Sequence, residues 1–302
     1  MKTVSPLRVH EPSRLALSLE LIRWRRPEGW LLLLWPTLTA LWVAARGFPG
    51  WSLLAIFGLG TILMRSAGCC VNDTADSNFD MHVERTRCRP IARGALSRHQ
   101  ALTTAGWLAT ASFGLVLMTN LATITWAIVA GGVAVLYPFT KRVFAMPQLV
   151  LGIAFSFGIP MAFAATHGVG FLGLGPDLPA IAGLVSANLL WVLAYDTVYA
   201  MVDREDDLRI GIRSSAITLG RWDVIVVTTS YVASLLVLSA TVLMSSGRSE
   251  ILFGCAVAAV LIAWHSREIR TGKRERRLRS FVANHWIGFV LFVGTALSFS
   301  QQ

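Results

Sequence analysis

Residues 178–207 read LPAIAGLVSANLLWVLAYDTVYAMVDREDD, a long apolar run that is followed by an acidic end. Its first part, residues 178–198, is almost wholly apolar, and a helix needs about 20 such residues to cross a bilayer. Its second part carries several carboxylates directly after the apolar run. Ionisable groups at membrane depth are costly unless they are matched, and they mark functional sites. The stretch therefore predicts a transmembrane helix that ends in a functional, acidic segment.

Eight other apolar runs are separated by charged residues or by Gly and Pro. These runs do not alternate apolar and polar residues with a period of two, so a membrane strand barrel is excluded. We predict an all-α, polytopic membrane protein with nine transmembrane helices. The nine runs cover residues 29–45, 51–71, 101–119, 121–136, 148–167, 178–198, 224–244, 251–266 and 281–299.

The composition supports a membrane protein, because 54% of the residues are hydrophobic and only 15% are charged. Soluble chains have about 25% charged residues. In a soluble protein the formal net charge of +10 would suggest a nucleic-acid partner. Here, however, all but two of the 27 Lys and Arg residues fall on alternate connections, with Arg46 and Arg248 on the opposite side. This asymmetry predicts an N terminus in the cytoplasm, a C terminus outside, and no nucleic-acid partner.

Residues 1–28 form a polar and basic arm, and its composition is not that of a cleavable signal peptide. Within the arm, residues 15–24 have the amphipathic spacing of a helix that lies along a membrane interface. No connection between the apolar runs is long enough to fold alone as a soluble domain. We therefore predict a cytoplasmic arm, residues 1–28, followed by a single transmembrane domain, residues 29–302.

An acidic cluster lies at the cytoplasmic end of the second run, where residues 72–80 read NDTADSNFD. Like charges three or four positions apart on a helix repel one another, so a helix that concentrates them needs a cation. Oxygen ligands without His or Cys suit Mg²⁺, which commonly bridges protein carboxylates to substrate phosphates. Taken alone, such a cluster is more often a solvated helix end. At ~100° per residue an arc of about 100° contains Asn72, Asp73, Asp76 and Asp80.

The sixth run ends in a second cluster of the same kind. Both clusters fall on the same side of the membrane, four spans apart, so they can face each other across a helix bundle. Two such clusters favour a functional site over two solvated helix ends, and we predict that they bind Mg²⁺ between them. The residues of the second cluster, which again share one arc of a helix, are Asp196, Tyr199, Asp203, Asp206 and Asp207.

Basic residues occur beside both acidic clusters. The positive-inside rule explains most of the basic residues on this side, including the run from Arg267 to Arg279. The basic residues close to the carboxylates are candidates for binding a diphosphate, because Mg²⁺ and guanidinium groups together bind such a group. These candidates are Arg85, Arg87, Arg89, Lys141, Arg142, Arg204, Arg209 and Arg213.

The two clusters resemble the signatures of the UbiA superfamily of intramembrane prenyltransferases, whose first motif has the form NDxxDxxxD. Further stretches are similar to the branch that prenylates 4-hydroxybenzoate. The most specific is YDTVYAMVDREDD, residues 195–207, in which Tyr199 stands where many other superfamily members carry an acidic residue. The similarity extends over about residues 20–299 and includes residues 31–42, 85–94, 137–165, 195–220 and 281–294.

The resemblance implies a helix bundle around a central cavity, with a diphosphate at the cytoplasmic end and a prenyl chain in a groove open to lipid. It implies a Mg²⁺-dependent transfer of a polyprenyl group from polyprenyl diphosphate to the ring carbon ortho to the hydroxyl of 4-hydroxybenzoate. That reaction is a step of ubiquinone biosynthesis. The implied location is the bacterial cytoplasmic (inner) membrane, with membrane lipid around the bundle and the active site toward the cytoplasm.

The resemblance also implies roles for residues at the matching positions. The implied ligands of Mg²⁺ are Asn72, Asp76, Asp80, Asp196 and Asp203. The residues implied to bind the diphosphate or the acceptor are Asn72, Asp80, Arg89, Lys141 and Arg142. Tyr199 or a neighbouring carboxylate would be the base. The residues implied in catalysis are Asp76, Asp196, Asp203, Arg142 and Tyr199.

Two alternatives remain open. Within the superfamily, the acceptor can be another aromatic compound, such as a naphthoate, homogentisate, or a haem or chlorophyll precursor. Outside it, a membrane transporter also carries intramembrane acids, but it would place them deep within its spans and use broken helices or inverted repeats. Here the acids cluster at one face, at span ends and next to arginines, which favours the enzyme.

Overall fold

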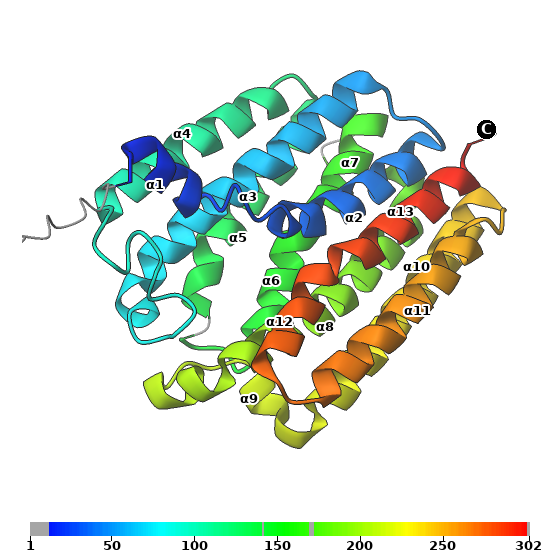
Figure 1. Ribbon diagram of the computed structural model, residues 1–302. Helices are drawn as coiled ribbons and strands as arrows, with labels where there is room; N and C mark the ends of the chain where they lie inside the picture. The colour runs from blue at the N-terminus through cyan, green and yellow to red at the C-terminus, as the bar shows by residue number, and fades with distance from the viewer. Residues whose placement is uncertain (1–11, 141, 169–171, 301–302) are drawn as a thin grey trace, which may run out of the picture.

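The computed structural model describes residues 12–140, 142–168 and 172–300, and they form a bundle of helices (Figure 1). Because no β-strand occurs within these ranges, the all-α prediction is confirmed. Two short 3-10 helices, η1 (Gly175–Asp177) and η2 (Gly220–Trp222), precede longer helices. The α-helices are α1 (Arg14–Leu21), α2 (Glu28–Ala45), α3 (Trp51–Asp80), α4 (Arg98–Val116), α5 (Leu121–Thr140), α6 (Pro147–Ser156), α7 (Gly158–His167), α8 (Leu178–Ile210), α9 (Ser215–Leu219), α10 (Asp223–Ser246), α11 (Ile251–Arg270), α12 (Arg274–Ala283) and α13 (His285–Ser298).

Eight helical segments of the described residues are long and apolar enough to cross a membrane. The predicted run at residues 101–119 forms α4, a helix of 19 residues that is not among the eight and that carries several polar side chains. The count of nine spans and the orientation of the two ends therefore stay predictions. The eight segments are Glu28–Ala45, Trp51–Asp80, Leu121–Thr140, Pro147–His167, Gly175–Ile210, Ser215–Ser246, Ile251–Arg270 and Arg274–Ser298.

Two helices, α3 and α8, are much longer than a bilayer requires. They have 30 and 33 residues, which is about 45 to 50 Å of helix, whereas the hydrocarbon core is about 30 Å thick. Both continue without a break through the acidic clusters. The clusters are therefore helical, and their side chains repeat with the helical period that the sequence analysis assumes. α8 ends before Gly211, whose φ of +73° is a conformation that glycine readily adopts.

The predicted run at residues 148–167 is divided into two helices. α6 gives way to α7 at Phe157, three residues before Pro160. A proline at position 160 has no N–H to donate to the carbonyl of Ser156, and its ring crowds that carbonyl. The proline therefore explains why this span is broken near its middle.

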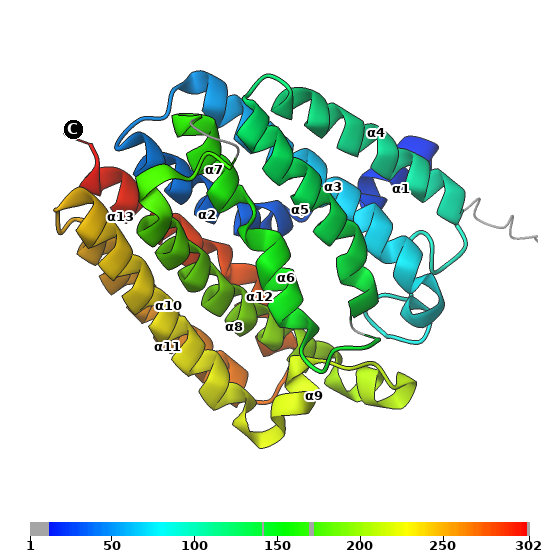
Figure 2. The same ribbon diagram turned by 180° about the vertical axis from the view of Figure 1, so that it is seen from behind.

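The helix α8 lies at the centre of the bundle. It packs against α10, α6 and α12, and Figure 2 shows α6 and α8 between the group of α3, α4 and α5 and the pair of α10 and α11. Val192, Tyr195 and Val198 of α8 are completely buried in the main apolar core. Because these side chains fix the rotation of α8 about its own axis, they also set the direction in which its acidic end points.

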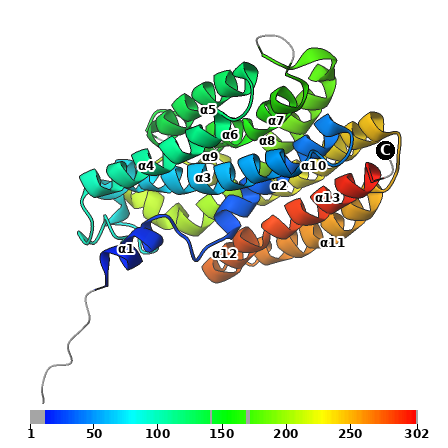
Figure 3. The same cartoon turned by 90° about the horizontal axis from the view of Figure 1, so that it is seen from above.

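The predicted amphipathic segment of the arm forms α1, which lies outside the main bundle (Figure 3). Ser13 caps its N terminus by accepting a hydrogen bond from the N–H of Ala16 at 3.2 Å. Leu17 and Leu21 are buried in a second apolar cluster with side chains of α3 and α4. The apolar face of α1 thus holds the end of the arm beside α3. Residues 1–11 of the predicted arm lie outside the described residues.

Candidate active site

A cavity of about 1200 Å³ opens within the bundle, and both acidic clusters line it. α3 contributes Asn72 and Asp76 to its wall, and α8 contributes Asp196 and Asp203. The two clusters are far apart in the sequence, and the packing of the bundle brings them to the wall of the same cavity.

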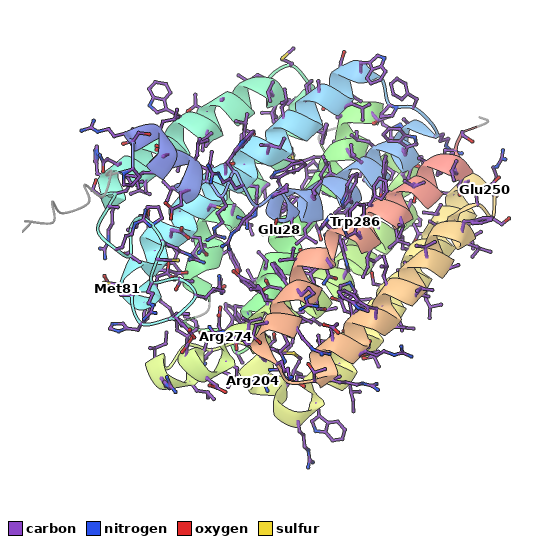
Figure 4. The ribbon with its side chains drawn as sticks, in the orientation of Figure 1. Glu28, Met81, Arg204, Glu250, Arg274 and Trp286 are labelled. Atoms are coloured by element: carbon purple, nitrogen blue, oxygen red, sulfur yellow. The ribbon has the colours of Figure 1, made fainter. Side chains whose placement is uncertain are left out.

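The charged part of the cavity belongs to one end of the bundle. Figure 4 shows Met81, Arg204 and Arg274 at this end, whereas Glu250 lies at the opposite end. Residues 81–97, which connect α3 to α4, also lie here, and we call them the cap loop. The cap loop contributes several side chains to the cavity wall, among them Arg85 and Arg89.

The carboxylates of the first cluster are buried, with exposed fractions of 2% for Asp73, 3% for Asp76 and 7% for Asp80. Arg89 of the cap loop binds two of them: its Nη1 lies 3.0 Å from Asp73 Oδ1 and 2.8 Å from Asp80 Oδ2. Arg23, just after α1, donates to Asp73 Oδ1 at 2.7 Å. Buried carboxylates are costly unless they are paired, so these arginines stabilise the charge of the first cluster.

In the second cluster, Arg85 of the cap loop binds Asp203 through two nitrogens. Nε lies 3.0 Å from Oδ1 and Nη2 lies 2.5 Å from Oδ2, which is the two-pronged geometry of a strong ion pair. The same guanidinium lies over the ring of Tyr199, 4.4 Å from its centroid. Asp196, two turns earlier on α8, lines the cavity and makes no hydrogen bond or ion pair with the described residues. Asp196 is therefore available to a ligand.

Arg23 and Arg85 keep their positive charge in this setting. Burial alone would lower the pKa of Arg85, but the neighbouring acidic side chains, Tyr199 and Asp203, outweigh burial and raise that pKa above its ordinary value. The pKa of Arg23 is also raised, because acidic groups around it, Asp73 among them, outweigh the effect of burial. Both guanidinium groups therefore remain protonated at any working pH and present fixed positive charge to the cavity.

Of the candidate basic residues that the structure describes, Arg85, Arg89 and Arg213 line the cavity, whereas Arg87, Arg142, Arg204 and Arg209 do not. Lys141 lies outside the described residues. Arg142 is exposed, and its Nη2 donates to the carbonyl of Ala75 at 3.1 Å while its guanidinium lies over the rings of Phe79 and Phe139. In this arrangement Arg142 fastens the chain after α5 to α3. The contact of Lys141 and Arg142 with substrate stays a prediction.

Two arginines that the motifs do not select, Arg23 and Arg65, line the same cavity. Arg65 lies on α3 two turns before Asn72, where its Nη1 donates to Cys69 Sγ at 2.6 Å and its Nε to the carbonyl of Gly29 at 3.3 Å. A basic residue inside an apolar run is the sequence signal for Arg65, because such residues are costly in a membrane. Arg23 gives no comparable signal, since it is one of several arginines in the basic arm.

Away from the charged end, the cavity wall is largely apolar. Phe113 and Val116 of α4, Ile128 and Ala134 of α5, and Leu151 of α6 all contribute to it. A site with a few charged groups at one end and an apolar wall beyond them suits a ligand with an anionic head and a hydrocarbon chain.

The oxygen donors at the cavity suit a hard divalent cation such as Mg²⁺. Within the described part of the chain, no group of three His, Cys, Asp or Glu side chains is close enough to hold a metal ion by itself. Arginines engage some of the carboxylates. The donor set thus fits an ion that phosphate oxygens of a substrate help to coordinate, rather than an all-protein site. The five donors on the wall are Asn72, Asp76, Asp80, Asp196 and Asp203.

Two relatives that match this chain over its full length have the same name. The chain is 56% identical over 304 residues, covering 100% of both chains, to the 4-hydroxybenzoate octaprenyltransferase of Paracidovorax citrulli (strain AAC00-1). It is 52% identical over 301 residues, covering 99% of both chains, to the 4-hydroxybenzoate octaprenyltransferase of Albidiferax ferrireducens.

The fold also matches solved structures. The apo structure of a UbiA homolog from Aeropyrum pernix K1 matches with a TM-score of 0.78 and 22% identity, covering 88% of this chain and 97% of that one. A UbiA homolog from Archaeoglobus fulgidus bound to GPP and Mg²⁺ matches with a TM-score of 0.65 and 15% identity, covering 94% and 96%. At these identities the likeness concerns the fold.

The model of the UbiA prenyltransferase family matches residues 33–288. This range contains both acidic clusters, the cap loop and most of the helices of the bundle. The match extends over most of the chain and agrees with the full-length relatives. The chain therefore belongs to the UbiA prenyltransferase family.

Proposed function

We propose that this protein transfers a polyprenyl group from a polyprenyl diphosphate to the ring carbon ortho to the hydroxyl of 4-hydroxybenzoate and releases diphosphate, as a step of ubiquinone biosynthesis. The cavity carries this proposal, because its charged end and apolar wall match the two parts of a polyprenyl diphosphate. Relatives that share more than half of the residues are named 4-hydroxybenzoate octaprenyltransferases. An octaprenyl donor is therefore the first to test.

Magnesium is the proposed cofactor. When bound, Mg²⁺ neutralises charge on the diphosphate and so makes it a better leaving group. A fold neighbour from Archaeoglobus fulgidus is bound to GPP and Mg²⁺, which supports the same pairing here. The residues that would hold the ion from the two sides of the cavity are Asn72, Asp76, Asp80, Asp196 and Asp203.

The arginines of the cavity would bind the diphosphate. Arg23, Arg85 and Arg89 bind carboxylates of the two clusters, and a guanidinium group binds phosphate oxygens with the same paired geometry. Binding of a diphosphate by these groups would leave carboxylate oxygens for the cation. The bond between prenyl C1 and the diphosphate oxygen then breaks, the electron pair leaves with the diphosphate, and an allylic cation remains.

The acceptor needs a partner for its carboxylate and a base for its ring proton. Arg65 lies on the cavity wall two turns before the first acidic cluster on α3, and we assign it to the carboxylate of 4-hydroxybenzoate. The ring carbon ortho to the hydroxyl attacks prenyl C1 and then loses its proton. Asp196, which lines the cavity, would accept this proton through the carboxylate oxygen that does not hold the cation. Tyr199 is the other candidate base.

The site must keep water from the allylic cation, because water would hydrolyse it. The cap loop lies at the charged end, and the apolar wall and the bilayer exclude water elsewhere. Aromatic rings on the wall, including those of Tyr137, Tyr199 and Phe281, can stabilise the positive charge through their faces.

The proposed setting is the bacterial cytoplasmic membrane. The eight apolar segments require a bilayer, and the basic connections favour a cap loop on the cytoplasmic face. In this setting, residues 29–302 act as a single transmembrane domain, and residues 1–28 form a cytoplasmic arm.

The decisive assay uses the purified protein in lipid with Mg²⁺, octaprenyl diphosphate and 4-hydroxybenzoate. We expect octaprenylated 4-hydroxybenzoate, and a rate that falls by about 100-fold or more in Asp76→Asn and Asp196→Asn, because charge stabilisation at a reacting centre is worth that much. Asp177→Asn, which changes an aspartate of η1 that pairs with His167 at 3.2 Å, should leave the rate unchanged.

Other acceptors separate the alternatives. Product with a naphthoate or with homogentisate, but not with 4-hydroxybenzoate, would support another branch of the family. Absence of any prenylated product, together with substrate uptake into sealed vesicles that depends on Asp76, would contradict the proposal and support a transporter.

A further inference from the structure

Arg274 begins α12 and contacts three carboxylates from two other parts of the chain. Its Nη1 lies 2.7 Å from Glu84 Oε2 in the cap loop. Its Nη2 lies 3.1 Å from Asp206 Oδ2 and 3.5 Å from Asp203 Oδ1, both on α8. One guanidinium group therefore joins α12, α8 and the cap loop at the end of the bundle where Figure 4 labels Arg274.

Neither helix stability nor membrane orientation explains these contacts. The N terminus of a helix is the positive end of its dipole, so a basic residue in the first turn of α12 is slightly unfavourable. The positive-inside rule explains a basic residue on this face, but any exposed position would satisfy that rule, as Arg270, Lys273 and Arg279 do. The contacts of Arg274 are specific to the carboxylates.

The charges of α8 explain why Arg274 matters. Asp203 and Asp206 are three residues apart on one helix, so their carboxylates repel each other. Both side chains are little exposed, at 11% and 10%, so water screens this repulsion poorly. Arg274 contacts both, and Arg85 holds Asp203 as well. Arg274 offsets the repulsion between the two carboxylates, whereas Arg85 contacts only Asp203 of the two.

Arg274 acts from outside the cavity. Asp203 is part of the cavity wall, whereas Arg274, Asp206 and Glu84, although all described, are not. We propose that Arg274 is a positioning residue that orients Asp203 toward the cavity and holds the cap loop against α8. Its kinetic consequences rest on the proposed function, whereas its effect on the cap loop does not.

Three substitutions separate this role from a simple change in charge. Arg274→Gln removes the charge, and Arg274→Lys keeps the charge without the forked geometry that reaches two groups. Arg279→Gln makes the same charge change at an exposed position of the same helix and is the control. We expect Arg274→Gln to raise the KM for octaprenyl diphosphate and for Mg²⁺ by about tenfold or more. Arg274→Lys should recover part of this loss, and Arg279→Gln should match the wild type.

Hydrogen–deuterium exchange of the substrate-free and metal-free protein gives a second measurement. We expect faster exchange of the amides of residues 81–97 in Arg274→Gln, and also in Glu84→Gln, which removes only the link to the cap loop. Arg279→Gln should exchange at the wild-type rate in this segment.

The proposal is overturned if Arg274→Gln and Arg279→Gln have the same KM values and the same exchange. It is also overturned if Arg274→Gln only lowers the melting temperature, with normal KM values and no recovery by lysine. If Arg274→Gln does not fold, Glu84→Gln decides: faster exchange supports the proposal and unchanged exchange contradicts it. If the wild type makes no prenylated product, the proposed function fails, and the exchange experiment still tests the link between Arg274 and the cap loop.

Discussion

The charged side chain of Arg65 indicates which kind of ligand the membrane cavity binds. It lies within the membrane-spanning segment of α3, where a charged group is costly unless it is matched. Its hydrogen bonds to Cys69 and Gly29 use only part of a guanidinium group that has five N–H donors. The remaining donors, together with its place on the cavity wall, suit an anionic ligand such as a carboxylate.

We predict that Arg65→Gln raises the KM for 4-hydroxybenzoate by about 10-fold to 100-fold, because a hydrogen bond to a charged group contributes about 1.5–3 kcal/mol. The KM for octaprenyl diphosphate should change much less, since Arg23, Arg85 and Arg89 remain. Steady-state kinetics with each substrate varied in turn checks this. Arg279→Gln is the comparison, because Arg279 is exposed and lies outside the cavity wall. A rise in both KM values in Arg65→Gln would contradict the assignment.

At the scale of the element, close contact between helices limits which side chains the spans tolerate. α2 packs against α7, and the first residue of α7, Gly158, faces Thr37 so closely that a Cβ on Gly158 would overlap the Thr37 side chain. Thr37 Oγ1 donates to the carbonyl of Leu33 in its own helix at 2.8 Å, which is a bond that α2 does not need for its backbone. The absence of a side chain at position 158 thus permits the approach of the two helices.

We predict that Gly158→Ala destabilises the protein by about 1–3 kcal/mol, the usual cost of overpacking. Thr37→Ala should restore most of this loss in the double variant, because it removes the atoms that overlap. Thermal unfolding in detergent measures both effects. Gly106→Ala on α4, where a Cβ meets nothing within 4 Å, is the control and should be neutral or slightly stabilising. Equal melting temperatures for Gly158→Ala and Gly106→Ala would refute the packing argument.

The whole molecule has two chemically different ends. The cap loop, the acidic clusters and Arg274 lie at one end, whereas the connection between α10 and α11, with Glu250, lies at the other (Figure 4). Since basic connections stay in the cytoplasm, the first end should face the cytoplasm and the second the outside.

Thiol labelling tests this orientation. Cys88 is exposed in the cap loop, and Ser249 is exposed in the connection between α10 and α11. We predict that a membrane-impermeant maleimide labels Cys88 in inside-out vesicles but not in right-side-out vesicles, and that Ser249→Cys in a Cys88→Ser background shows the reverse pattern. The opposite result would mean that the active site faces the outside.

Local patterns in the sequence are enough to establish the class of the protein and its two acidic clusters. Apolar run length, basic asymmetry and the spacing of carboxylates on a helix are local properties, and they do not depend on how helices pack. They gave the all-α membrane fold, and they selected Asp76, Asp80, Asp196 and Asp203, all of which line one cavity. The same local properties separate α4 from the eight apolar segments, because its polar residues lower its hydropathy.

Which basic group contacts which carboxylate depends on how distant helices pack. Arg85 and Asp203 are 118 positions apart, and Arg274 and Asp203 are 71 apart, so no local pattern pairs them. In the sequence Arg274 is one of several basic residues that orient the protein. Its contact with α8 and the cap loop exists because the buried core fixes α8 in one rotation and places α12 beside its acidic end. Pairing of this kind depends on packing between distant helices, which local hydrophobicity and periodicity do not specify.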